Sequence, residues 1–513
     1  MYTALIIDTL SIQSYIFGSN KLKENIGGSY IIEHLVYKKM IPLALEASGI
    51  SSDFDINKWT THFDNYLLKT DSTAKVEAGY IGGGNALVIF RKEEEANTFI
   101  NFHSKLVLQY FPGLKIAYAT HEFNYEEGDS YKFFLKEINR KLYLNRSYYP
   151  SSSLPFKHGI AEDCAWSNEA QEIEVQYKNS KNIVSQMSKS RIDVVEASQK
   201  NLEGFLSAEQ VQKYAFTTDL GQLGQQEDKG YVAIVHADGN GMGIRFRQCD
   251  SLAATRKLSK GVIDLAETVM RNMIQHILAL VESKNFNNLI LSEDGGKKVL
   301  PIRPLISGGD DITFVCEGRL GIHLAEKLLK LMTTTSIDGE TISACAGIAI
   351  VHTKYPFYKA YQMAEELTHK AKEASRQDKS SWIHYLISTG GFSGSYEDVL
   401  FSQYTLPGGK TLKNGPYRID ASGNSIQKLK SGMQYLITSS GSNKGWPGNK
   451  IKDLRDTLRK DEAFQKYFLA EIDARGLKLP SGYEALWTER NTPFHDMVEL
   501  LDFYPQELLS YEI

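Results

Sequence analysis

The chain repeats one order of strands and helices, and this internal duplication constrains its fold more than any other feature. In the second copy, the apolar strand Tyr231–Ala237 ends at Asp238, and a helical segment and a hairpin with a Gly-Gly turn follow. Another helix, the strand Thr341–Val351 and a last helix complete the unit. The first copy starts with the strand Tyr2–Ile7, ends it at Asp8, and keeps the same order. Two generic β-α-β-β-α-β units could share this periodicity, but glycine pairs in both hairpin turns favour a true duplication.

The spacing of the two copies supports this interpretation. Asp8 precedes Ser29 by 21 residues, and Asp238 precedes Ser259 by the same interval. Sliding the first hairpin over the second aligns Gly83, Gly84, Asn85 and Ala86 with Gly308, Gly309, Asp310 and Asp311. The first copy therefore lacks both acidic residues of the second.

These patterns predict an α+β protein with two tandem ferredoxin-like domains, here named the first and second palm. A chain of 513 residues is too long for one hydrophobic core. We expect the first palm at 1–149, a mostly helical insert at 150–229, the second palm at 230–388 and a helical C-terminal domain at 389–513.

Composition excludes some classes of protein. A net charge of −4 and a pI near 6.3 give no overall attraction to nucleic acid, so a polyanion would need local basic patches. Asp8 comes too early for a secretory signal, and no apolar run approaches the ~20 residues of a membrane span. Single, scattered cysteines argue against a zinc ribbon or a disulfide framework and favour a reducing cytoplasm; they are Cys164, Cys249, Cys316 and Cys345.

The turn Gly308–Asp311 (Gly-Gly-Asp-Asp) is the first candidate for chemistry. Glycines let a ligand approach the backbone closely, because no Cβ stands in the way. Two carboxylates at the edge of an apolar strand are costly unless a cation compensates them. Oxygen ligands suit Mg²⁺ or Mn²⁺, which also bind substrate phosphates. An ordinary turn would contain the same residue types, since glycine and aspartate both favour turns.

Asp238 strengthens the metal interpretation, because the first strand of such a unit lies beside the hairpin. We therefore expect Asp238, Asp310 and Asp311 to hold one or two metal ions for phosphoryl transfer. Glycine-rich loops can bind phosphates through backbone N–H groups, and a lysine on the last helix can add a mobile charge. The residues expected to contact nucleotide in this palm are Gly239, Asn240, Gly241, Gly243, Ser259, Ser307, Gly308, Gly309 and Lys372.

These motifs resemble the large polymerase-like subunit of type III CRISPR effector complexes, which has two palms and a GGDD active site in the second. The sequences HADGNGMG, SGGDD and AEEL…AK carry the resemblance in the second palm, and IDTLSIQSYIFGSNKLKENIGGSYII carries it in the first. The resemblance implies an antiviral nucleotidyltransferase that joins ATP through 3′–5′ linkages into cyclic oligoadenylate. It also implies that Gly27, Gly28 and Ser29 line a second nucleotide, with both palms of one chain forming the active site.

Two departures from that family are visible. The chain starts directly with the first palm, without the family's histidine–aspartate nuclease domain, and His495–Asp496 lies in the wrong place to replace it. The segment Leu154–Ala170 stands where the family often binds zinc, but it keeps one cysteine, so we expect no structural zinc. Guide RNA and CRISPR-type subunits are possible partners, and Gly409–Lys460 has eleven Lys/Arg against three Asp. That segment is either an RNA surface or a solvated helical face. The alternatives for the whole chain are a stand-alone cyclic dinucleotide synthase and a scaffold subunit without turnover.

Overall fold

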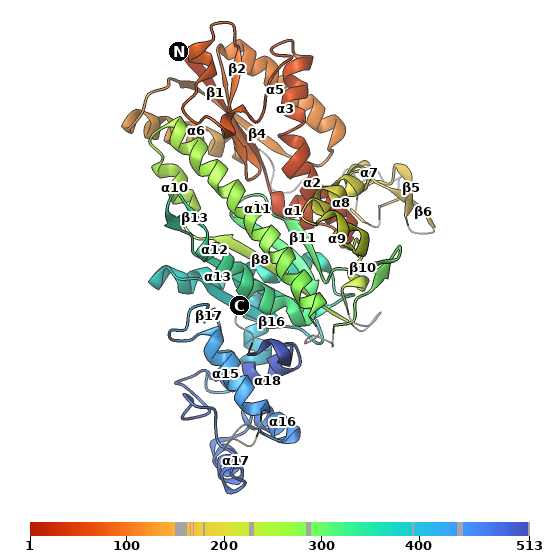
Figure 1. The fold of residues 1–513 in the computed structure, drawn as a ribbon, viewed down its shortest axis with the longest axis vertical. Coiled ribbons are helices and arrows are strands. Elements are labelled where there is room, and N and C mark those ends of the chain that lie inside the picture. Colours follow the sequence, from red (N-terminus) through yellow and green to blue (C-terminus); the bar gives the residue numbers. More distant parts are fainter. Residues whose placement is uncertain are drawn as a thin grey trace.

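Two sheets organise the molecule, and four antiparallel strands have the same order in both (Figure 1). The computed structural model describes residues 1–148, 162–164, 166–167, 169–177, 180–224, 230–283, 289–391, 394–438 and 445–510. In each palm the second strand of the unit is at one edge, followed by the third, the first and the fourth. This is the order of a ferredoxin-like β-α-β-β-α-β unit, so the predicted α+β fold with two palms is confirmed.

The first palm has a four-stranded sheet, β2-β3-β1-β4, whose strands are largely buried. In this palm α2 begins at Leu22 and continues directly as a short π-helix, η1. Its elements are β1 (Tyr2–Thr9), α1 (Ile12–Phe17), α2 (Leu22–Tyr30), η1 (Ile31–Val36), α3 (Met40–Ala47), η2 (Lys58–Thr60), α4 (Leu67–Thr70), β2 (Val76–Gly82), β3 (Asn85–Phe90), α5 (Glu93–Tyr110), β4 (Ile116–Phe123) and α6 (Asp129–Ser147).

The second palm has a six-stranded sheet, β11-β12-β8-β15-β16-β17. Strand β16, which the sequence analysis did not predict, pairs in parallel with β15 and extends the sheet towards the C-terminal domain. The elements are β8 (Tyr231–Gly239), α10 (Met242–Gln248), α11 (Leu252–Glu282), β9 (Glu293–Asp294), β10 (Lys297–Val299), β11 (Ile302–Ile306), β12 (Asp311–Glu317), η4 (Gly318–Leu320), α12 (Gly321–Thr334), β13 (Ser336–Ile337), β14 (Glu340–Thr341), β15 (Ala344–His352), α13 (Phe357–Asp378) and β16 (Trp382–Ile387).

The insert between the palms contains helices, as expected, but also an unpredicted antiparallel hairpin. Its described elements are β5 (Ile173–Tyr177), β6 (Ser180–Val184), α7 (Gln186–Asp193), α8 (Val195–Glu203), α9 (Ala208–Lys213), β7 (Tyr214–Ala215) and η3 (Leu220–Gln222). The C-terminal region consists of α14 (Tyr396–Val399), η5 (Leu400–Tyr404), β17 (Tyr417–Arg418), α15 (Ile426–Ile437), α16 (Gly448–Thr457), α17 (Glu462–Ala474), α18 (Pro493–Leu501) and η6 (Gln506–Leu508).

Strand pairing corrects the alignment of the two hairpins by one residue. In the first palm Asn85 lies opposite Asp8, and in the second palm Asp311 lies opposite Asp238. Asn85 is therefore the structural counterpart of Asp311 and not, as the sequence alignment placed it, of Asp310. The reason is the length of the turn: two residues separate the paired Gly82 and Asn85, whereas six separate the paired Ile306 and Thr313.

Helix α11 joins the palms, running from the first into the second as the long green helix of Figure 1. Near its N-terminus the buried Arg256 forms an ion pair with Glu77 of β2 at 3.0 Å. The same guanidinium donates hydrogen bonds to the backbone carbonyls of Phe63, Asn65, Gly79 and Ala78 at 2.7 to 3.1 Å. A side chain of the second palm is thus buried among residues of the first palm and bonded to them.

Candidate functional site

The acidic residues of the second palm meet at the end of its central strands. Asp238 is the penultimate residue of β8, and Asp311 opposite it begins β12. The backbone N–H of Gly239 donates to the carbonyl of Asp310 at 3.2 Å, which ties the hairpin tip to the strand end. A Cβ at Gly239 would lie 2.9 Å from the Cβ of Asp310, so only glycine lets this carboxylate come so close.

The electrostatics of this group indicate a deficit of positive charge. Burial, together with the nearby Asp238, raises the pKa of Asp310 to about 6. Burial and the charges of Asp238 and Asp310 raise the pKa of Asp311 well above its usual value. Lys372 is the one cation among the described residues that lowers either pKa. A divalent cation bound by oxygen ligands would supply the missing charge, so these residues fit Mg²⁺ or Mn²⁺.

Lys372 of α13 forms an ion pair with Asp238. Both side chains are partly exposed, at 25% and 31%. The ammonium is therefore close enough to the three acids to compete with a cation for Asp238 or to bind an incoming anion. Among the described residues, Asp238, Asp310 and Asp311 do not form a cluster whose carboxylate oxygens all lie within 4.8 Å of one another.

The loop after Asp238 contains a glycine in the left-handed conformation and an asparagine whose side chain holds the loop in place. Gly241 has φ +77°, which favours glycine, and it precedes α10, while Gly243 lies in the first turn of α10. The amide of Asn240 donates to the hydroxyls of Ser343 and Ser375 at 3.0 Å each. Asn240 thus holds the loop against β15 and α13, so its side chain supports the loop rather than facing outwards.

The two hairpin tips meet across the interface between the palms. A Cβ at Gly309 would lie 3.8 Å from the Cα of Gly83. Beside them is a cavity of about 960 Å³ lined by both palms, by α11 and by α8 of the insert. From the second palm Ser307, Gly308 and Asp311 line it, and from the first palm Asp8, Ser29 and Gly83 do so. A cavity of this volume accommodates small-molecule ligands the size of nucleotides.

Nine of the twelve predicted nucleotide contacts do not line this cavity: Gly27, Gly28, Gly239, Asn240, Gly241, Gly243, Ser259, Gly309 and Lys372. Gly27 and Gly28 are buried in α2, where a Cβ on Gly27 would lie 1.9 Å from the carbonyl oxygen of Arg191. Gly27 thus allows α2 to pack closely against α7, and Gly28 allows it to pack against α1. Ser259 is buried on α11 and is also absent from the cavity wall. Ser29 does line the cavity, but its hydroxyl donates to the carbonyl of Leu305 in β11.

The structure adds two groups that the sequence analysis missed. Glu33 of η1 lines the cavity, and a Cβ on Gly308 would lie 3.3 Å from its carboxyl carbon, so an acid of the first palm touches the GGDD turn. Arg146 of α6 also lines the cavity and forms an ion pair with Asp8. No local motif marks either residue. The separation of Arg146 from Asp8, 138 residues, nevertheless resembles the 134 residues between Lys372 and Asp238.

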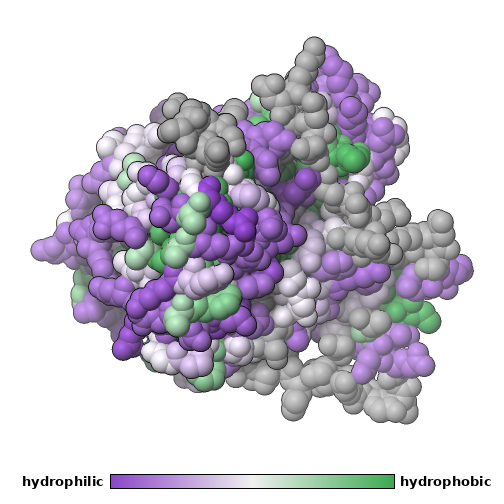
Figure 2. Space-filling view, turned by 90° about the horizontal axis from the view of Figure 1, so that it is seen from below, coloured by the Kyte–Doolittle hydropathy of each residue, from purple (hydrophilic) through white to green (hydrophobic). Residues whose placement is uncertain are grey.

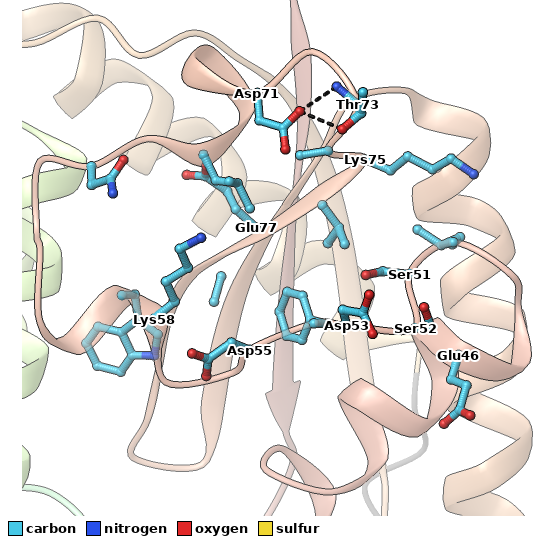
Figure 3. A pocket seen from close by; sticks show the side chains of 18 of the residues that line it. Glu46, Ser51, Ser52, Asp53, Asp55, Lys58, Asp71, Thr73, Lys75 and Glu77 are labelled. Atoms are coloured by element: carbon cyan, nitrogen blue, oxygen red, sulfur yellow. Dashed lines mark hydrogen bonds between the residues drawn. The ribbon is translucent and has the colours of Figure 1, made fainter.

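Another cavity, of about 610 Å³, lies beside β2 of the first palm (Figure 3). Asp53, Asp55 and Lys58 line it from one loop, and Asp71 binds the backbone and hydroxyl of Thr73 at its rim. None of the predicted site residues lines this cavity. Its Glu77 belongs to the Arg256 ion pair, so part of its wall serves to join the palms.

His495, Asp496 and Glu499 bring three potential metal ligands together within 4.8 Å. Lys413, which is itself buried, lies 3.1 Å from Asp496 and also pairs with Glu499. The lysine already supplies the positive charge that these acids need. Together these residues form a buried ion network within the C-terminal domain.

The basic segment Gly409–Lys460 has acidic partners for many of its charges. Seen from below, the C-terminal end of the molecule is mainly hydrophilic with scattered hydrophobic patches (Figure 2). Five of the basic residues form ion pairs with Asp or Glu: Lys413, Arg418, Lys430, Lys450 and Arg455. This pairing favours a solvated, internally neutralised face over an RNA surface.

In the part of the chain that the structure describes, no helix has the length and apolar character of a membrane span. The segment Leu154–Ala170, for which we expect no structural zinc, lies mostly outside the described residues.

Comparison with known proteins gives matches in sequence and in fold. Residues 231–381 match the family model of the Cas10/Cmr2 second palm domain. No curated protein matches the sequence. A Csm1-Csm4 cassette in complex with pppApA has a TM-score of 0.56 at 12% identity, covering 100% of this chain and 69% of that one. The cassette in complex with cA4 has a TM-score of 0.54 at 12% identity, covering 100% and 70%. Csm1 in T. onnurineus has a TM-score of 0.55 at 11% identity, covering 98% and 70%.

The family match spans the strand that ends at Asp238, the GGDD turn and the helix that carries Lys372. The fold matches extend through both palms and the C-terminal region. The second palm therefore matches the Cas10/Cmr2 second palm domain family, and the chain as a whole is similar in fold to Csm1 from type III CRISPR complexes.

Proposed function

We propose that this protein is a metal-dependent nucleotidyltransferase that joins ATP into cyclic oligoadenylate in a type III CRISPR-like antiviral system. The observation that carries the proposal is the meeting of Asp238, at the end of β8, with Asp310 and Asp311 of the neighbouring hairpin, beside a cavity between the palms that Asp311 lines. The family match of the second palm supports it, as do the similar structures of Csm1-Csm4 cassettes in complex with cA4, cA3 and AMPPNP.

In the proposed mechanism each palm holds one nucleotide. The donor triphosphate lies on the second palm, where Asp238, Asp310 and Asp311 would hold Mg²⁺ or Mn²⁺. Such ions polarise the α-phosphate and lower the pKa of the attacking hydroxyl. We expect the ammonium of Lys372 to leave Asp238 and bind a phosphate oxygen of the donor, since the Lys372 side chain is partly exposed. The glycines at 239, 308 and 309 let the substrate approach the backbone.

The acceptor nucleotide lies on the first palm with its 3′-hydroxyl directed at the donor. Ser29, Gly83 and Glu33 line the cavity from this side. The first palm offers Asn85 where the second has Asp311, so it has lost an acid needed to bind a metal ion. In this proposal the first palm binds the acceptor nucleotide, and the second palm activates the donor nucleotide.

The proposed partners follow from the same comparisons. Several similar structures are complexes of Csm1 with Csm4, so we propose an equivalent subunit, and with it guide RNA, as partners of this chain in the cytoplasm. The two alternatives predict other outcomes. A stand-alone enzyme would make a cyclic dinucleotide, and a scaffold would make no product.

The direct test is incubation of the purified protein with each NTP and Mn²⁺ or Mg²⁺, followed by mass spectrometry of the products. We expect cyclic products from ATP only. A cyclic dinucleotide would support the stand-alone alternative. Absence of product both alone and with its complex partners would contradict the enzyme assignment.

Metal affinity should increase with pH. The raised pKa of Asp310, about 6, means that protons compete with the metal for this carboxylate in weakly acidic solution. Below pH 6 the apparent Kd for Mn²⁺ should rise by roughly tenfold per pH unit for each proton displaced. Calorimetry between pH 5 and 8 measures it, with Asp310→Asn as control. A pH-independent Kd would show that this carboxylate does not bind the ion.

One chain should suffice for activity, because α11 and Arg256 hold both palms together. Tethered sites face each other at roughly millimolar effective concentration. A chain with Asp310→Ala and Asp311→Ala, mixed with a chain blocked by Ser14→Trp, should not regain activity. Ser14 is exposed and lines the cavity from the first palm. Recovery of product in the mixture would demonstrate an intermolecular site, and full activity of Ser14→Trp alone would remove the acceptor nucleotide from this cavity.

A further inference from the structure

The first palm retains most of the architecture that surrounds the acids of the second. Asp8 ends β1 as Asp238 ends β8. Three residues later each chain segment adopts the left-handed conformation, with φ +50° at Ser11 and +77° at Gly241. At Ser11 this conformation is unfavourable for a side chain. In both palms a left-handed residue thus lies directly before the helix that follows the first strand.

Each of these aspartates is paired with a cation from the corresponding helix. Helix α6 follows the fourth strand of the first palm, and α13 follows the fourth strand of the second. Arg146 near the end of α6 donates from Nε to Asp8 at 2.9 Å and also from a terminal nitrogen. Lys372 on α13 donates to Asp238. Arg146 is therefore the counterpart of Lys372.

The balance of charge differs between the two palms. In the second palm three acids share one ammonium group. In the first palm Gly84 and Asn85 replace the two acids of the turn, so Asp8 stands alone and one guanidinium balances it. Arg146 remains 44% exposed, while Asp8 is 10% exposed. A guanidinium has five N–H donors, so those not bonded to Asp8 can bind a ligand in the cavity.

We propose that Arg146 binds the phosphates of the acceptor nucleotide, and that the first palm binds this nucleotide without a divalent cation. The inference rests on the proposed function, since it assigns the acceptor nucleotide to the first palm. Arginine matches phosphate geometry through paired N–H donors, and it is always charged. Asp8 is a positioning residue that fixes the guanidinium at the cavity wall.

Calorimetry on the full chain tests the proposal, with α,β-methylene ATP as probe in EDTA. The background carries Asp310→Ala and Asp311→Ala, so that the second palm is disabled. We expect one equivalent to bind, and Arg146→Ala to weaken it about 10- to 100-fold, the value of charge-assisted hydrogen bonds. Adenosine, which has no phosphate, should bind both proteins equally. Arg140→Ala is the matched control, because Arg140 lies on the same helix and pairs with Glu137.

Each result decides the question. An unchanged Kd for Arg146→Ala, or an equal loss for adenosine, would overturn the phosphate role. Binding that requires Mg²⁺ would overturn the claim of independence from metal. If Arg146→Ala does not fold, the neutral pair Asp8→Asn with Arg146→Gln replaces it and should show the same loss. Failure of the unmodified protein to make product from ATP and Mg²⁺ would overturn the proposed function, a separate outcome from the binding result.

Discussion

Replacing Asp310 and Asp311 together with alanine should abolish product formation from ATP while leaving the fold intact. Both residues lie at a hairpin tip with partly exposed side chains. Burial, and after it the charges of neighbouring carboxylates, raise the pKa of both groups, so the substitution removes two carboxylates whose charged forms are unfavourable in this place. The thermal midpoint should therefore stay level or rise. Loss of metal ligands in comparable sites costs several orders of magnitude in rate, about 10³-fold or more.

The matched control for this experiment is Asn85→Ala. Asn85 occupies the position of Asp311 in the first palm, and it faces Asp8 as Asp311 faces Asp238. Because no metal is proposed there, this variant should keep its affinity for Mn²⁺. Product at the original rate from the doubly substituted chain would refute the role of the GGDD turn. Loss of Mn²⁺ binding in Asn85→Ala would place metal in the first palm as well.

Arg256→Ala should destabilise the protein by about 3 to 5 kcal/mol, the cost of breaking a buried ion pair by removing one partner. Arg256 is 2% exposed and Glu77 is 4% exposed, so the carboxylate would stay buried without its cation. Four backbone carbonyls of the first palm would also lose a donor. Because these contacts join the palms, catalysis should fall along with stability.

Chemical denaturation followed by circular dichroism measures the change in free energy of unfolding. Arg271→Ala is the control on the same helix, since Arg271 pairs with Glu267 and its side chain is 47% exposed. That variant should change stability by less than about 1 kcal/mol. If Arg256→Ala unfolds no more easily than Arg271→Ala, the palms are held together by other contacts and the single-chain argument loses its main support.

Much of the fold could be predicted from the sequence, because local patterns specify it. Apolar strands such as Tyr231–Ala237 and the amphipathic α11 have the periodicity of their secondary structure, and the palm order follows from their sequence along the chain. The failures lie where local pattern is weak. Strand β16 lies at the predicted end of the second palm, and the hairpin β5–β6 consists of two short strands inside a mainly polar segment. The alignment of the two palm hairpins depended on the length of the second turn, which no residue type specifies.

The sequence by itself determined that Asp238, Asp310 and Asp311 belong to one site, because the order of strands in a duplicated palm puts them at one sheet edge. Only the tertiary structure decided what surrounds them. Gly27 and Gly28, predicted as ligand contacts, are buried where α2 packs against α7 and α1. Conversely, Arg146 reaches Asp8 across 138 residues of sequence. Such pairs depend on the packing of distant elements, and side-chain chemistry alone does not specify which elements will meet.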